Sequence, residues 1–205
     1  SLPPPVLEDH PDSMVSFIQQ EIVSATLTFQ AVEETVQGLK AVLQGKGLLT
    51  PTIFRQGSAI INGEVPKEWT FYWEGPEAPT KWLLLFSQKA QALSPWLAKT
   101  QQASLLLKPL DLAHIFHPGI FLNCLRQMTA RKLQISVDNL KLEASFEKGS
   151  LKSEMTLSAQ GLFLQGSGFK NGVIGEPEEE QSEYIKVPAL SLAWTPVSML
   201  GLSTG

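Results

Sequence analysis

The sequence predicts an α+β fold, in which a helical subdomain with a long amphipathic helix precedes an antiparallel, incomplete β-barrel. Two patterns predict this order. Apolar residues recur at helical spacing as far as Leu133, and from Leu140 onward they alternate with polar residues at a period of two. With 205 residues, 43% of them hydrophobic and 18% charged, the chain is long enough to bury a substantial core.

We divide the chain into a proline-rich lead-in (1–11), a helical subdomain (12–135) and a β subdomain (136–205). The lead-in has no Met and no signal pattern, so we interpret the chain as a piece cut from within a longer polypeptide. Residues 187–205 carry no charge over the length of a membrane span, but Pro188 and Pro196 argue against a transmembrane helix. We expect the chain to stop within a fold.

Charge and cysteine content exclude some classes of protein. A net charge of -4 gives no electrostatic basis for binding nucleic acid, which usually requires a basic patch. The single cysteine, Cys124, excludes an internal disulfide framework and fits a reducing compartment.

The first element is a long helix. Its apolar positions have a mean spacing of about 3.6 residues, and the helix has a length of about 45 Å. These positions are Met14, Ile18, Ile22, Ala25, Phe29, Val32, Val36, Leu39 and Leu43. Gly45 and Gly47 end the helix. Such a helix belongs either in an ordinary core or along a larger body, and the sequence leaves both open.

Proline and capping residues mark the next helices. Thr50-Pro51 opens a short helix that Asn62-Gly63 ends, and Val65-Pro66 opens a turn. After the connector 74–79, Thr80 and Ser94-Pro95 each begin a further helix.

Four tryptophans fall in this region. An aromatic cage or a base-stacking platform is one interpretation, but their helical spacing among Leu and Phe favours core packing. They are Trp69, Trp73, Trp82 and Trp96.

Residues 109–133 join the two halves. Asp111 is expected to cap a turn, and Pro118 to start a helix. Phe121, Leu125 and Met128, at i, i+4 and i+7, form the apolar stripe of that helix and are expected to pack in the core. Three polar residues fall off the stripe, namely Arg126, Gln127 and Arg131.

The β half shows alternation interrupted by turn residues. Residues 140–147 and 151–160 read as two strands joined by a hairpin turn at 148–150. Residues 162–169 are predicted to form a third strand. Asn171-Gly172 predicts a second hairpin turn, followed by a short strand at Val173-Ile174. Residues 190–194 are predicted to form the last strand. Five glutamates within residues 176–183 indicate a solvated loop.

No catalytic, cofactor-binding or metal-ligating residue is predicted. Asp111, His114 and His117 superficially resemble a metal triad, but Pro118 disfavours helical geometry at His117, and capping is the simpler role for Asp111. Gly45-Lys46-Gly47 lacks the other residues of a phosphate-binding loop. Cys124, within the apolar stripe, is expected to be inert.

An ordered set of residues resembles the C-terminal region of dynein heavy chains. The resemblance extends from the long helix to Gln165-Gly166. Within it, the sequence is most similar to the cytoplasmic dynein class of intraflagellar transport. The residues that carry it are Trp69, Trp73-Glu74-Gly75-Pro76, Leu110-Asp111-Leu112, Phe116-His117-Pro118, Phe121-Leu122-Asn123, Leu125-Arg126-Gln127, Ala130-Arg131, Ser136-Val137-Asp138 and Leu140-Lys141-Leu142.

The resemblance implies a non-catalytic domain that follows the sixth AAA+ module of a motor ring and lies across one face of that ring. It implies that the domain binds no nucleotide, that ATP and Mg are bound elsewhere in the parent chain, and that the domain modulates how ATP turnover becomes microtubule-based movement. The expected partners are the ring and dynein accessory chains, with no nucleic acid and no membrane. The expected location is the cytoplasm and cytoskeleton, in the cilium or flagellum.

Two hypotheses remain open. Arg126, Gln127 and Arg131 make polar contacts with the ring or between subdomains, or they form a solvated helix face. The whole chain is otherwise an autonomous protein-binding module, which presents an open sheet edge or its Trp-rich helices to a peptide or accessory subunit.

Overall fold

The computed structural model describes residues 12–102, 105–147, 149–151, 153, 155–170, 173–176 and 184–200. The proline-rich lead-in, the second hairpin turn at 171–172 and most of the glutamate-rich loop lie outside these residues. Contacts group the chain into two compact units. Among the described residues, the first unit consists of residues 18–95, and the second of residues 12–17 and those from 96 to 200. The predicted subdomains 12–135 and 136–205 divide the chain by type of secondary structure and not by contacts. This division stays a prediction.

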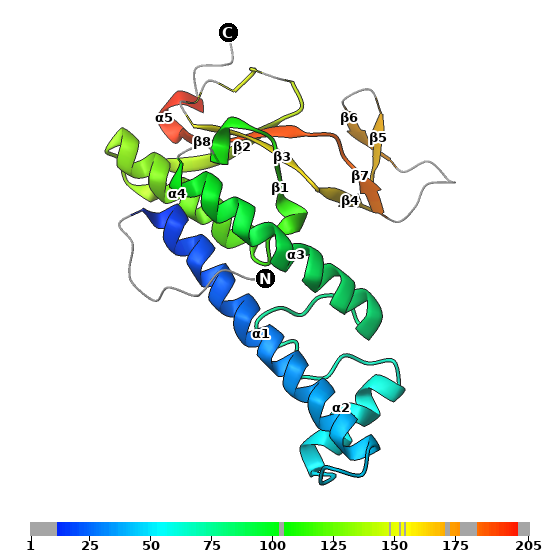
Figure 1. The fold of residues 1–205 in the computed structure, drawn as a ribbon. Coiled ribbons are helices and arrows are strands. Elements are labelled where there is room, and N and C mark those ends of the chain that lie inside the picture. Colours follow the sequence, from blue (N-terminus) through cyan, green and yellow to red (C-terminus); the bar gives the residue numbers. More distant parts are fainter. Residues whose placement is uncertain are drawn as a thin grey trace. The chain divides into compact units, whose positions relative to one another are not determined.

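Helices make up most of the first half of the chain (Figure 1). The α-helices of the described residues, in both halves of the chain, are α1 (Ser13–Leu43), α2 (Pro51–Ile61), α3 (Pro79–Gln101), α4 (Pro118–Leu133) and the short α5 (Val197–Leu200). Three short 3-10 turns, η1 (Leu105–Leu107), η2 (Leu112–His114) and η3 (Val137–Asn139), lie between them. In the part of the sequence that the structure describes, no helix is long and apolar enough to cross a membrane.

The long helix α1 has the predicted length, but its apolar stripe is only partly buried. Met14, Ile18 and Ile22 are buried, whereas Phe29, Val36 and Leu43 are exposed to 51, 50 and 87%. The stripe therefore extends along the helix beyond the surface that the other described residues pack against it.

The helix starts obey the capping signals. The Thr50 hydroxyl accepts a hydrogen bond from Ile53 N at 3.3 Å, and Pro51 occupies the first turn of α2. At the other end Asn62 is the C-cap, and Gly63 follows with a positive φ of 77°. In the first unit α2 lies beside the C-terminal end of α1 (Figure 1), where a Cβ added to Gly57 would contact Leu39.

The predicted helix start at Ser94-Pro95 is wrong. Pro95 lies inside α3, which begins at Pro79 and runs unbroken to Gln101. The buried residues Phe86, Leu93 and Trp96 continue at helical spacing on both sides of the proline. Burial of this continuous stripe offsets the local cost of a proline within a helix.

The β half is a mixed sheet and not the purely antiparallel one predicted. Its four strands have the order β1-β3-β8-β2 (Figure 1), and β1 runs parallel to β3 while the other pairs are antiparallel. The strands are β1 (Leu110–Asp111), β2 (Leu140–Ser145), β3 (Thr156–Gln160) and β8 (Leu190–Pro196). Within the described residues the sheet closes no barrel.

The predicted hairpin between 140–147 and 151–160 is also wrong. β8 lies between these two runs, pairing Leu142 with Trp194 on one side and Leu157 with Leu192 on the other. The return strand is shorter than predicted and begins at Thr156. The alternating patterns of β2 and β3 are real, but alternation does not specify which strand is the neighbour.

Two small antiparallel strand pairs also lie in the second unit. β5 (Gly168–Lys170) pairs with β6 (Val173–Gly175), which confirms the hairpin predicted around Asn171-Gly172. β4 (Phe163–Gln165) pairs with β7 (Tyr184–Lys186).

Candidate functional site

In segment 109–133 the structure has the cap and the helix start that the sequence predicts. Asp111 accepts a hydrogen bond from Ala113 N at 3.0 Å and caps η2, and Pro118 occupies the first turn of α4. Phe121 and Leu125 are buried and Met128 is half-buried. The Phe121 ring lies 5.5 Å from that of Trp96 and 5.9 Å from that of Phe17, so its side of α4 packs in the core.

Arg126 lies at a junction of three elements in the second unit. Its Nε donates to Val137 O on η3 at 2.9 Å, and its guanidinium lies 5.2 Å from the centroid of the Trp194 ring on β8. Trp194 in turn donates from Nε1 to Leu122 O on α4 at 2.9 Å. The carboxylate of Asp138, 3.8 Å from Arg126 Nη2, is almost fully solvated and adds little.

The other two off-stripe residues do not converge with Arg126. Arg131 is exposed, and its Nη1 donates to Ser13 Oγ at 2.8 Å. Gln127 is half-buried. A contact of these three residues with another protein surface stays a prediction.

The histidines near Asp111 do not assemble with it into a recognisable ligand set. The Asp111 carboxylate is engaged in its cap, and His114 is exposed. Among the described residues no group of three or more His, Cys, Asp or Glu side chains is placed to hold a metal ion.

Cys124 is buried on α4. Burial raises the pKa of its thiol above the ordinary value, and the negative charge of Asp12 raises it further. A thiol with a raised pKa carries little thiolate at neutral pH, which makes a nucleophilic role unfavourable.

The tryptophans of the first unit form a packed cluster. Trp82 is fully buried, with its ring 5.6 Å from Trp69, 5.4 Å from Trp73 and 5.2 Å from Phe86. The indole nitrogens of Trp69 and Trp82 donate to Thr35 Oγ1 and Glu74 O. Trp73 is half-buried, and the Lys89 ammonium lies 5.4 Å from the centroid of its ring. An aromatic cage needs an open face, and the two buried indoles offer none.

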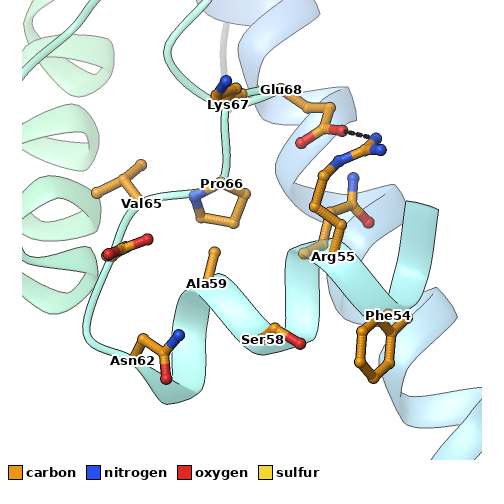
Figure 2. A pocket seen from close by; sticks show the side chains of 11 residues that line it. Phe54, Arg55, Ser58, Ala59, Asn62, Val65, Pro66, Lys67 and Glu68 are labelled. Carbon is orange, nitrogen blue, oxygen red and sulfur yellow. Dashed lines mark hydrogen bonds and ion pairs between the residues drawn. The ribbon is translucent and has the colours of Figure 1, made fainter. Parts of the chain in front are cut away.

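A groove in the first unit was not indicated by the sequence. It lies between α2 and residues 64–68, has a volume of about 390 Å³ and is drawn in Figure 2. Arg55 Nη2 pairs with Glu68 Oε1 at 2.9 Å at one end. Burial opposes the charge on Glu68, but the hydrogen bonds and charge of Arg55 outweigh it and lower the pKa of this carboxyl group. Asn62-Gly63 and Val65-Pro66 were visible as turn signals, but a groove arises only when the turn folds back along the helix.

The family model and the similar proteins found by comparison all point to the same protein family. A family model described as the C-terminal domain of the dynein heavy chain matches residues 4–202. The protein is similar to cytoplasmic dynein 2 heavy chain 1 of Homo sapiens, with 32% identity over 198 residues, covering 97% of this chain and 5% of the relative. It is 35% identical over 179 residues to cytoplasmic dynein 2 heavy chain 1 of Tripneustes gratilla, covering 87% of this chain and 4% of the relative. Dynein axonemal heavy chain 1 of Homo sapiens is more distant, at 25% identity over 202 residues (94% of this chain and 4% of the relative). The 205 residues thus span only about one-twentieth of the length of the relatives that they match.

Proposed function

Because the chain belongs to the family of dynein C-terminal domains, we propose that it is a non-catalytic regulatory and structural module of a dynein motor. In this role it packs on the AAA+ ring of its own heavy chain and modulates the coupling of ATP turnover to movement along microtubules. Its open sheet is then part of an incomplete barrel. The observation that carries the proposal is the family match over residues 4–202.

The exposed stripe of α1 supports docking on a larger body. Phe29, Val36 and Leu43 are seven residues apart, so they lie on one face of the helix. All three are at least half exposed. Apolar side chains aligned on one helix face are typical of a surface that packs against another element.

Two of the relatives named above, the cytoplasmic dynein 2 heavy chains, support the proposed motor class and its surroundings. Their identities of 32 to 35% favour a dynein of the cytoplasmic dynein 2 type, acting in retrograde intraflagellar transport within the cilium or flagellum. The module itself binds no cofactor, since ATP and Mg are bound by other parts of the parent polypeptide. Its partners are the ring and dynein accessory chains, and neither nucleic acid nor membrane.

A second candidate function is an autonomous protein-binding module. In the described part of the sequence β2 is an outermost strand that pairs only with β8, so its other edge is open to an added strand. The Trp-rich helices suit this role less well, because Trp69 and Trp82 are buried.

Deletion in the whole motor tests the first proposal. The full heavy chain is compared with a version that lacks these 205 residues, in single-molecule motility and ATPase assays. We expect altered run length or stall force with ATP turnover retained, and no Mg-dependent ATP hydrolysis by the isolated module. Unchanged motility, or turnover by the isolated module, contradicts the proposal.

A further inference from the structure

We propose that the groove between α2 and residues 64–68 binds an extended peptide of a separate polypeptide, and that this peptide carries one large apolar side chain between an acidic and a basic one. This site lies within the first unit and is distinct from the apolar stripe of α1. The inference goes beyond the proposed role in the motor and does not depend on it.

The groove has an apolar centre of suitable size. Figure 2 shows Pro66 facing Ala59 across it, with Val65 on the same side as Pro66. Pro66 is buried, while Ala59 and Val65 are half-buried, so the centre is open to solvent on one side. A volume of about 390 Å³ lies at the small end of the range for ligand sites. It accommodates one large side chain together with its backbone.

Of the four charged side chains that line the groove, two are paired with each other and two can pair with a ligand. Arg55 and Glu68 neutralise each other. Lys67 and Glu64 are exposed and line the groove, and neither side chain makes an ion pair or hydrogen bond within the described residues. Charge complementarity therefore places an acidic side chain of the ligand at Lys67 and a basic one at Glu64.

The backbone of Val65 favours a peptide as the ligand. Proline disfavours a helical conformation in the residue before it, and Val65 lies outside any helix or strand. Its N–H and C=O make no hydrogen bond with the other described residues. Main-chain pairing to such a residue, combined with a side-chain pocket, is a recurring mode of peptide recognition. The walls come entirely from residues 54–68, so the groove is complete without another part of the motor.

The test uses the full heavy chain and a fluorescein-labelled octapeptide, Ser-Thr-Glu-Thr-Phe-Thr-Lys-Ser, in fluorescence polarisation. In an extended peptide alternate side chains face the same side, so Glu, Phe and Lys all face the groove. We expect saturable binding that Ala59→Trp weakens at least about tenfold, because the new ring fills the centre. Lys67→Glu is expected to weaken binding by about threefold. A peptide with Lys in place of its Glu is expected to bind the Lys67→Glu protein with the lost affinity restored. It is expected to show no such gain on the wild-type protein.

Thr52→Trp is the matched control, since Thr52 is exposed on the same helix and does not line the groove. It is expected to leave peptide binding unchanged, and thermal unfolding shows whether each variant folds. No saturable binding up to about 1 mM overturns the proposal. Binding that is insensitive to Ala59→Trp, or a Lys67→Glu effect without charge-swap rescue, overturns it as well. If another part of the motor fills the groove, the peptide does not bind, and a separate polypeptide is then excluded as the ligand.

Discussion

Gly161 combines a left-handed backbone with a close approach to another segment. Its φ is 75°, and an added Cβ would collide with the Asp111 carboxyl group and lie 2.9 Å from Ala113 N. These are the two groups that form the cap of η2. The turn after β3 therefore depends on glycine for two independent reasons.

We expect Gly161→Ala to lower the free energy of unfolding by about 2–4 kcal/mol, since backbone strain and displacement of the Asp111 cap add up. Gly149→Ala is the control, because Gly149 has a similar φ of 79° but open space around its Cα. It is expected to cost only about 1 kcal/mol. Urea denaturation measures both, and equal losses would show that the contact with Asp111 is unimportant.

The buried thiol of Cys124 gives stability a pH dependence. Burial and the negative charge of Asp12 raise its pKa in the folded protein above the ordinary value of a cysteine thiol. The unfolded protein therefore loses this proton first as the pH rises. The thiol's contribution to the free energy of unfolding is fully present below its pKa in the unfolded protein. This contribution is lost as the pH rises through its pKa in the folded protein.

This dependence is measured as a difference between two proteins. Unfolding free energies of wild type and Cys124→Ala are compared at about pH 7 and about pH 10. Other groups titrate in both proteins, so only the thiol changes their difference. We expect wild type to lose more stability than the variant at the higher pH. A difference that is constant, or that grows in favour of wild type, would mean that the folded environment does not raise this pKa.

Among the elements, those with local signals were predictable from the sequence. Thr50 and Asp111 each accept a backbone N–H bond two or three residues ahead, as their positions before a turn or helix suggested. The long helix α1 and the β5–β6 hairpin likewise follow from spacing and turn residues close together in the sequence.

Elements that depend on distant residues were predicted less well. β8 inserts between β2 and β3 from about 30 residues further along the sequence, and β1 joins the sheet with only two residues. Strand alternation tells which side chains face the core, not which strand lies alongside. The groove beside α2 escaped prediction for the same reason, as did the position of Arg126 against Trp194.

Arg126 is expected to hold α4, η3 and β8 together. Arg126→Met removes the bond to Val137 O and the cation over the Trp194 ring, so unfolding free energy should fall by about 1–3 kcal/mol. Asp138→Asn should change it by less than about 0.5 kcal/mol, because the Asp138 side chain is 88% exposed. Thermal unfolding monitored by circular dichroism compares the two. A larger loss from Asp138→Asn would assign the junction to the ion pair instead.

At the scale of the whole molecule, several large apolar side chains of the described residues are exposed. Beyond the α1 stripe, Leu48 and Ile61 are exposed to 85 and 86%, next to the ends of α2. Sequence periodicity predicted apolar positions but not their burial, since burial depends on what else is present. Exposed apolar positions that cluster in this way are typical of surfaces that pack against another protein element.

Val36 provides the test of this interpretation. Its side chain is half exposed, so Val36→Asn should change the unfolding free energy of the 205-residue module by less than about 0.5 kcal/mol. If α1 docks in the full motor, the same change should weaken docking by about 1.5 kcal/mol, or roughly tenfold. Hydrogen exchange of the α1 amides in the full motor measures docking, with motility as a second readout. Gln30→Asn, at an exposed polar position of α1, is the control and should alter neither. If Val36→Asn leaves exchange and motility unchanged while deletion of the module alters motility, the module acts through a surface other than this stripe.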